Sequence, residues 1–266
     1  MIKSFLHIIL VIILTIVTQI GGLLWILNFG FYKVRGIKKT LAYRVVTFLL
    51  LYLITTFFIV PPLAKLNNRV HLPISKSGSL IPHNIITPLL NRHYVKPKLK
   101  SDLAEISKRV NFENKDFKVS YLDANFPFID GFPLLPHLSH SDGRKIDLSF
   151  FYTKNTKPSK HKPSISGYGY FVDLKKDESD QTEICKSKGY WQYDFTKYLT
   201  LGSRDDLEFD IQRTKKLIQL LVKAESTHKI LIEPNIKTRL QLTNDKIRFQ
   251  GCHAVRHDDH LHYQVH

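Results

Sequence analysis

Residues 136–147 have the sequence PHLSHSDGRKID, which places a histidine and an aspartate on either side of a turn. Gly143 predicts the turn, and the β-rich residues Lys145–Thr153 that follow it predict a strand. His140 precedes the turn, and Asp147 lies on the strand after it. A hairpin of this kind can bring the two side chains to one point.

The C-terminal residues 257–262 have the sequence HDDHLH, and an alternating pattern over residues 260–265 predicts a closing strand. Successive side chains of a strand point to opposite faces, so His260 and His262 share one face. They lie roughly 7 Å apart and can flank one metal-bound water. Asp259 is a rival acid–base group, but on a regular strand it faces away from the metal.

The histidine-rich end of the chain has two simpler explanations, namely surface histidines without a metal and an expression tag. Leu261, Tyr263 and Val265 keep a strand-like apolar alternation, which argues against a tag. Three N/O ligands with one open position are typical of catalytic zinc, whereas structural zinc usually has four ligands that include cysteine. Neither cysteine lies close in sequence to His140 and Asp147, so the pattern favours a catalytic site.

These motifs resemble the zinc-site motifs of the penicillin-insensitive murein endopeptidases. The resemblance rests on Ser139-His140-x-x-Gly143-x-x-x-Asp147, on His257-x-x-His260-x-His262, and on ILIEPNIK at residues 230–237, which resembles the family's strand before the last motif. The wider group contains lysostaphin-type peptidases, D-alanyl-D-alanine metallopeptidases and the hedgehog signalling domain. The resemblance covers about residues 117–265 and is patchy between the motifs.

The resemblance implies a role for each histidine and for the aspartate of these motifs. His140, Asp147 and His262 are implied as the zinc ligands. His260 is implied as a base or transition-state stabiliser beside the metal, with His257 supporting it. His137 matches a further family histidine near the metal, as an additional ligand or as a residue that supports the ligands.

The predicted elements give an α+β order, because the strands do not alternate regularly with helices. Further strands are predicted at Phe117–Leu122 and Lys229–Ile232. The best helix is predicted at Leu207–Ala224, where one face can be apolar. Asp205 and Asp206 are predicted to cap its N-terminus.

Residues 102–266 are implied by the resemblance to form a small zinc metallopeptidase domain of the hedgehog and D-alanyl-D-alanine-peptidase type, with a central antiparallel sheet. The chain departs from the family in its membrane anchor, in a basic loop at residues 154–164 and in the poorly matched middle of the domain. The aromatic residues within Tyr190–Phe195 are predicted either to be part of the core or to line a substrate cleft.

Two apolar segments predict a membrane hairpin over residues 1–64. Residues 4–28 are apolar, with His7 and Gln19 as the main exceptions, and residues 45–64 are similar. Each length suits one bilayer crossing. A signal peptide would have a shorter core and no second span directly after it. A hydrophobic hairpin buried in a soluble protein would be shorter and less apolar.

The loop between the two segments predicts their orientation. It carries five basic residues: Lys33, Arg35, Lys38, Lys39 and Arg44. The positive-inside rule therefore predicts a cytoplasmic loop, with both termini outside. Lys65, Arg69 and Lys76 weaken this prediction without reversing it. In a bacterium the chain would be a multi-pass protein of the inner membrane, with its C-terminal domain facing the periplasm or cell wall.

The net charge of +16 is unevenly distributed along the chain. Residues 1–101 hold thirteen of the 39 Lys and Arg and none of the 23 Asp and Glu, which leaves about +3 for residues 102–266. The folded domain therefore lacks the basic excess of a nucleic-acid-binding protein, and no nucleic-acid partner is predicted. Residues 65–101 predict a basic stalk or linker, which is solvated or lies against anionic headgroups.

Cys185 and Cys252 are too few for a disulfide framework and lack CxxC spacing. They form one disulfide if the domain lies outside the cytoplasm, and otherwise they are two separate buried thiols. The sequence leaves both alternatives open.

The first functional expectation is a membrane-anchored, zinc-dependent peptidoglycan hydrolase that cuts an amide bond in the wall peptide. Zinc would acidify its bound water and polarise the scissile carbonyl. His260 would take a proton or stabilise the oxyanion, and would later return a proton to the leaving amine. Two alternatives are a D,D-carboxypeptidase and a non-catalytic zinc-containing wall-binding module. The expected partners are the peptidoglycan peptide and membrane lipid.

Overall fold

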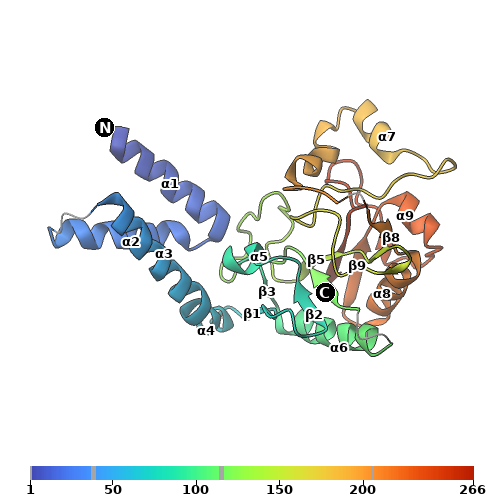
Figure 1. Cartoon of the computed structure of the whole chain (residues 1–266), viewed down its shortest axis with the longest axis horizontal. Coiled ribbons are helices and arrows are strands. Elements are labelled where there is room, and N and C mark those ends of the chain that lie inside the picture. Colours follow the sequence, from blue (N-terminus) through green and yellow to red (C-terminus); the bar gives the residue numbers. More distant parts are fainter. Residues whose placement is uncertain (1, 37–39, 114–116, 205) are drawn as a thin grey trace. The chain divides into compact units, whose positions relative to one another are not determined.

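The computed structural model describes residues 2–36, 40–113, 117–204 and 206–266. The chain forms two compact units, each made of segments that alternate along the sequence (Figure 1). Unit 1 comprises Met1–Leu72, Ile86–Pro97 and Ala124–Gly143. Unit 2 comprises Pro73–Ile85, Lys98–Asp123 and Arg144–His266.

Unit 2 is built on a six-stranded sheet with the strand order β10-β9-β11-β5-β4-β2. Its strands are β2 (Leu80–Pro82), β4 (Val119–Tyr121), β5 (Lys145–Ser149), β9 (Thr227–Leu231), β10 (Ile247–Arg248) and β11 (His260–Val265). The four central strands pair antiparallel, whereas β2 and β10 pair parallel with their neighbours. The predicted α+β class is confirmed, and the sheet is mixed rather than wholly antiparallel.

The two central strands β5 and β11 follow the alternation expected from their sequences. Ile146 and Leu148 are fully buried on β5, and Leu261 and Tyr263 are fully buried on β11. Side chains alternate between faces along a strand, so the polar residues between them share the opposite face. The predicted strand over residues 260–265 is confirmed at both ends.

The other elements of unit 2 surround this sheet. They are α6 (Pro97–Glu113, of which Pro97 belongs to unit 1), α7 (Gln181–Ser187), the 3-10 helix η2 (Trp191–Leu199), α8 (Ile211–Lys223), α9 (Pro234–Arg239) and a small sheet of β7 (Lys157–Pro158), β6 (Tyr152–Lys154) and β8 (Glu208–Phe209). The strand predicted at Lys145–Thr153 is therefore two strands, because β5 ends at Ser149 and β6 pairs in the small sheet.

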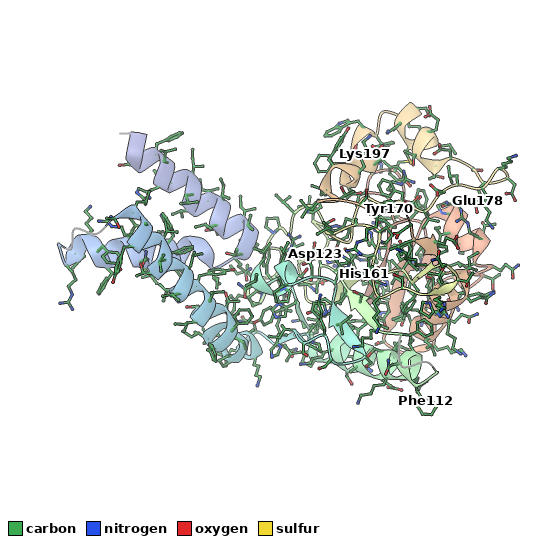
Figure 2. All side chains as sticks on the ribbon, in the orientation of Figure 1. Phe112, Asp123, His161, Tyr170, Glu178 and Lys197 are labelled. Atoms are coloured by element: carbon green, nitrogen blue, oxygen red, sulfur yellow. A yellow bond between two sulfur atoms is a disulfide. The ribbon has the colours of Figure 1, made fainter. Side chains whose placement is uncertain are left out.

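The amphipathic helices α6 and α8 supply much of the core of unit 2. Helix α6 buries Leu99, Leu103, Ile106 and Val110, whereas Phe112 near its end projects outward and is 91% exposed (Figure 2). Residues three and four positions apart lie on one face of a helix, which explains this pattern. Helix α8 buries its apolar face in the same way and packs against β9.

The helix predicted at Leu207–Ala224 begins later than expected. Glu208 and Phe209 form β8, and α8 starts after Asp210. Asp210 is the N-cap, because its carboxylate accepts a hydrogen bond of 3.0 Å from the backbone N–H of Arg213. The predicted capping role of Asp206 is therefore wrong, and Asp205 lies outside the described residues.

The apolar N-terminus of unit 1 does not form the two membrane-spanning helices that the sequence predicts. Its helices are α1 (Ile2–Thr18), α2 (Gly21–Val34), α3 (Leu41–Ile54), the π-helical turn η1 (Thr55–Ile59) and α4 (Val60–Leu66). Across the described residues, one continuous helix is long and apolar enough to cross a membrane, at Leu41–Leu66. The predicted span at residues 4–28 is broken into two helices, and a multi-pass arrangement is not supported.

The break between α1 and α2 has a local cause. Gln19 has a φ of 67°, which interrupts the helix, and its side-chain oxygen accepts a hydrogen bond of 3.0 Å from the backbone N–H of Phe128. The hydroxyl of Thr18 accepts from the N–H of Gly21 at 2.8 Å, which pairs the first backbone N–H of α2. A Cβ at Gly22 would lie 2.5 Å from the carbonyl oxygen of Val11, so only glycine permits this close helix pair.

The predicted linker at residues 65–101 is also not borne out. This segment contains β1 (Val70–His71), which pairs with β3 (Tyr94–Val95), as well as β2, α5 (Ile86–Leu89) and the start of α6. Leu72, Tyr94 and Leu99 are fully buried, so the segment is folded. Its low periodicity reflects elements of two to four residues, which are too short to produce a sequence pattern.

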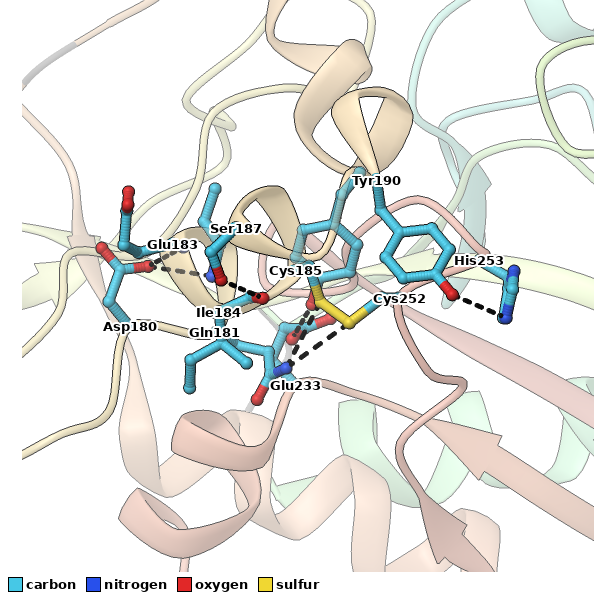
Figure 3. Close-up of a disulfide and its surroundings, with 12 residues drawn as sticks. Asp180, Gln181, Glu183, Ile184, Cys185, Ser187, Tyr190, Glu233, Cys252 and His253 are labelled. Carbon is cyan, nitrogen blue, oxygen red and sulfur yellow. Dashed lines mark hydrogen bonds between the residues drawn. A yellow bond between two sulfur atoms is a disulfide. The ribbon is translucent and has the colours of Figure 1, made fainter.

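The two cysteines form a disulfide in unit 2 between α7 and the loop before β11 (Figure 3). The bond joins Cys185 to Cys252 across 67 residues of sequence. The side-chain amide of Gln181 lies 3.3 Å from the sulfur of Cys185 and 3.9 Å from that of Cys252. Of the two alternatives left open by the sequence, the structure supports the bridge.

The disulfide predicts a defined mass and a stability effect. Protein isolated from its native compartment should lack two hydrogen atoms and should resist alkylation until it is reduced, when two thiols react. Replacing Cys252 with serine should lower the free energy of unfolding by about 2–4 kcal/mol, the usual effect of losing a bridge that closes a long loop. Two thiols alkylated without reduction would contradict the bridge.

Candidate metal centre

Asp147 and His262 face each other across the central strands β5 and β11. They are register partners, and Oδ1 of Asp147 lies 3.0 Å from Nδ1 of His262. His260 lies two residues earlier on the same face of β11, with Nε2 3.7 Å from Oδ2 of Asp147. All three side chains are buried. Strand pairing thus places one carboxylate between two imidazoles.

Tyr168 fixes the carboxylate of Asp147. Its hydroxyl donates a hydrogen bond of 2.9 Å to Oδ2 of Asp147 and accepts one of 3.1 Å from the backbone N–H of Asp123. Its ring also meets the ring of His260 edge-on, with 5.0 Å between the ring centres. Sequence reasoning missed Tyr168, although it contacts two residues of the candidate site.

Two glycines hold the loop that carries Tyr168. Gly167 and Gly169 have φ values of 95° and 79°, a backbone region that residues other than glycine rarely adopt. A Cβ at Gly167 would lie 2.2 Å from a methyl carbon of Leu122, and one at Gly169 would lie 2.1 Å from the carbonyl oxygen of Thr196. The Gly-Tyr-Gly sequence is therefore the signal that could have pointed to this loop.

Asp259 acts on His260 rather than on Asp147. Its carboxylate hydrogen-bonds Nδ1 of His260, and its second oxygen accepts from the backbone N–H of Gly169 at 2.5 Å. Burial by itself lowers the pKa of His260, but the negative charges of Asp259 and Asp147 outweigh burial and raise that pKa to about 9. A cation shared with Asp147 would oppose this rise, because it would neutralise part of the carboxylate charge.

His257 lies beside the two histidines of β11. Its ring centre is 5.0 Å from that of His260 and 6.0 Å from that of His262. Its backbone N–H donates to Oε1 of Glu233 at 2.9 Å, and Glu233 also accepts a hydrogen bond from the hydroxyl of Tyr193. Glu233 thus joins the loop that carries His257 to the end of β9.

The acidic groups around this loop are deeply buried. Burial, reinforced by the charge of Asp258, raises the pKa of Glu233 to about 7. Asp258 forms an ion pair with Arg256, whose guanidinium lies 3.7 Å from the ring centre of Phe171. The two aspartates of the HDDH sequence therefore have separate roles, because Asp258 binds Arg256 and Asp259 binds His260.

The segment Ala124–Gly143 of unit 1 carries the remaining two histidines. His137 and His140 are buried, and their ring centres lie 5.4 Å apart. Nδ1 of His140 lies 2.7 Å from the carbonyl oxygen of Ala124. A carbonyl only accepts, so Nδ1 carries the proton and the lone pair of the neutral ring is on Nε2.

The predicted turn at Gly143 is confirmed. Gly143 has a φ of 80°, and its N–H donates to the side-chain oxygen of Asn125 at 3.0 Å. Arg69 is fully buried and donates to the carbonyl oxygen of Ser141 at 3.2 Å, while it also pairs with Asp130. Arg69, which lies three residues after the end of α4, therefore holds the loop that carries His137 and His140.

These buried side chains can hold a metal ion. Two sets of three offer suitable ligand atoms: His137, Asp147 and His260, and His140, Asp147 and His262. Imidazole nitrogens and carboxylate oxygens suit Zn²⁺ and other divalent first-row ions. The hydrogen bonds to Asp147 and His140 are of the kind that usually orient metal ligands.

No protein-family model matches this chain, and no curated protein matches it significantly. The resemblance to the murein endopeptidases therefore rests on the quoted motifs alone.

The aromatic cluster at Tyr190–Phe195 divides between core and surface. Tyr193 is fully buried against Glu233, whereas Trp191 is 74% exposed. Tyr190 donates or accepts a hydrogen bond of 3.2 Å with His253 beside the disulfide (Figure 3). Tyr193 is therefore part of the core, which is one of the two predictions for this cluster, whereas Trp191 lies on the surface.

Proposed function

We propose that this chain is a membrane-anchored, zinc-dependent hydrolase that cuts an amide bond in the peptide part of peptidoglycan. The observation that carries the proposal is the register of β5 and β11, which places Asp147 opposite His262 and beside His260 on a buried face. Buried ionisable side chains that cluster around one carboxylate, with a shifted pKa at His260, are the kind of arrangement that functional sites use. The motif resemblance supplies the class of substrate.

The proposed ligands are His140, Asp147 and His262. The tautomer of His140, with its proton on Nδ1, leaves Nε2 as the donor nitrogen for a metal. Nδ1 of His262 and Oδ1 of Asp147 lie 3.0 Å apart, so both atoms could bind one cation in place of their hydrogen bond. Bound zinc would supply Lewis-acid activation of a carbonyl and of a water nucleophile at neutral pH.

His260 is the proposed acid–base group. The carboxylate of Asp259 holds the proton on Nδ1, so Nε2 is the nitrogen that exchanges a proton with the reactants. His257 lies beside it and supports the ring. His137 remains a proposed additional ligand or supporting residue, since it belongs to a second set of side chains that can hold a metal.

The proposed location of the domain is outside the cytoplasm. The helix Leu41–Leu66 is the candidate membrane span; the five basic residues between Lys33 and Arg44 flank its start, whereas Lys65, Arg69 and Lys76 flank its end. The positive-inside rule places the more basic side in the cytoplasm and hence the C-terminal part outside. The disulfide is consistent with an oxidising compartment.

Digestion of purified wall fragments tests the proposal. The full chain, purified in a neutral detergent and loaded with zinc, should release peptide products that mass spectrometry identifies, and a chelator should stop the release. Products from cleavage within the cross-linked peptide would assign an endopeptidase. Release of free D-alanine alone would assign the D,D-carboxypeptidase alternative. Binding of zinc and wall fragments without any product would replace the enzyme by a wall-binding module.

A further inference from the structure

A cavity of about 470 Å³ lies within unit 2, lined by residues that the zinc site does not use. Its lining includes Ile81 of β2, Ser120 of β4 and Phe151. The basic loop noted in the sequence, residues 154–164, forms part of its wall. A volume of this size suits a small ligand.

The wall of this cavity is strongly basic. It carries five cationic side chains and two imidazoles: Lys76, Lys118, Lys160, Lys162, Arg204, His83 and His161. Among the described residues that line it there is no carboxylate. Unit 2 carries 29 Lys and Arg against 21 Asp and Glu, and five of its basic residues line this one cavity without an acidic neighbour in the described lining.

Lys162 is built into the cavity wall. Its ammonium donates to the carbonyl oxygen of Phe150 at 2.8 Å and lies 5.1 Å from the ring centre of Phe151. Burial lowers the pKa of Lys162 to about 8, although the charge of Asp210 opposes the shift. An ammonium that is partly removed from water loses hydration, which an anion in the cavity would replace.

His83 also lies close to the positive charges of this cavity. Its Nε2 donates to the carbonyl oxygens of Ser164 and Ile165 at 3.1 and 3.0 Å, which joins the end of β2 to the basic loop. Burial, followed by the charge of Lys162, lowers the pKa of His83 to about 4. A histidine whose protonation is opposed by nearby lysines lies where an anion is favoured.

We propose that this cavity is a binding site for a phosphate-bearing ligand. Several cations around one cavity match a ligand with more than one negative charge, and a guanidinium such as that of Arg204 can bind phosphate oxygens in pairs. The headgroup of an anionic lipid and a soluble phosphorylated compound share this chemistry. The proposal is independent of the zinc site, since the two share no residue.

Calorimetric titration of the detergent-solubilised full chain with inorganic pyrophosphate tests the site. At physiological salt we expect one saturable site, and the double variant Lys118→Gln/Arg204→Gln should bind at least about tenfold more weakly, since charge-assisted contacts are lost. The matched control is Lys175→Gln/Lys188→Gln, which removes the same charge from exposed positions of unit 2 outside the cavity. The control should bind like the unaltered chain, and thermal melting should verify that both variants fold.

Three outcomes overturn the site: no saturable binding of pyrophosphate, equal weakening in the control variant, or equally tight binding of the tricarboxylate tricarballylate. A comparison with glycerol 1-phosphate distinguishes the source of the ligand. Tighter binding of this headgroup analogue supports the site with a lipid ligand, whereas tighter binding of pyrophosphate supports it with a soluble one. Wall digestion and zinc content are measured separately, so either proposal can fail alone.

Discussion

Alanine in place of Asp147 is expected to remove nearly all of the zinc. Asp147 lies between His260 and His262 and is the one carboxylate common to both sets of side chains that can hold a metal. Loss of a residue that only orients a ligand costs roughly 10–100-fold in metal affinity, so loss of a ligand should cost more. Zinc per chain, measured by elemental analysis after dialysis, should fall from about one to a small fraction.

The same loss is expected for His140→Ala and for His262→Ala, because each removes one of three proposed ligands. His228→Ala is the matched control, since this half-buried histidine on β9 lies in neither set. The fold should largely survive in all four variants, because a domain of this size has its own apolar core. Full zinc retention by the His262→Ala protein would mean that the ligands are wrongly assigned.

Alanine in place of His260 is expected to abolish most amide hydrolysis while the zinc is retained. His260 lies on the face of β11 that carries His262, yet in the proposed site it exchanges protons and does not bind the metal. A positioned acid–base group typically contributes about 10²–10⁴-fold to the rate, so the loss of kcat should fall in that range. Single-turnover digestion of a defined wall peptide, together with zinc analysis, measures both quantities.

Asp259 provides a graded control for this prediction. Its carboxylate reaches the reactants only through Nδ1 of His260, so Asp259→Ala should be milder than His260→Ala. Asp259→Asn keeps the size of the side chain but loses the charge that raises the pKa of His260, so the pH profile of kcat should shift to lower pH. Loss of zinc from the His260→Ala protein would instead make His260 a ligand.

The parts of the fold that were predictable from the sequence have strong local patterns. The alternation at residues 260–265 and the glycine turn at Gly143 each depend on a few neighbouring residues, and the structure has both elements where the sequence predicts them. The proximity of His260 and His262 follows from strand geometry alone. The α+β class follows from the order of elements.

The features that the sequence alone could not predict depend on contacts between residues that are far apart in the sequence. No local pattern indicates that β11 pairs with β5, yet this pairing is what places Asp147 beside His262. Tyr168 reaches the site from a loop whose shape depends on Leu122 and Thr196, neither of which is near it in sequence. The break at Gln19 could not be predicted because the residues on both sides of it are apolar. An apolar composition indicates hydrophobicity but does not indicate whether the helix is continuous.

Arg69 joins the end of the apolar helix Leu41–Leu66 to the loop that carries His137 and His140. It follows α4 by three residues, is fully buried, and bonds the backbone of Phe126 and Ser141 on either side of His137 and His140. A different N-terminal anchor could be joined to this chain with the loop intact only if the junction lies before Arg69, because a later junction removes the guanidinium that holds the loop.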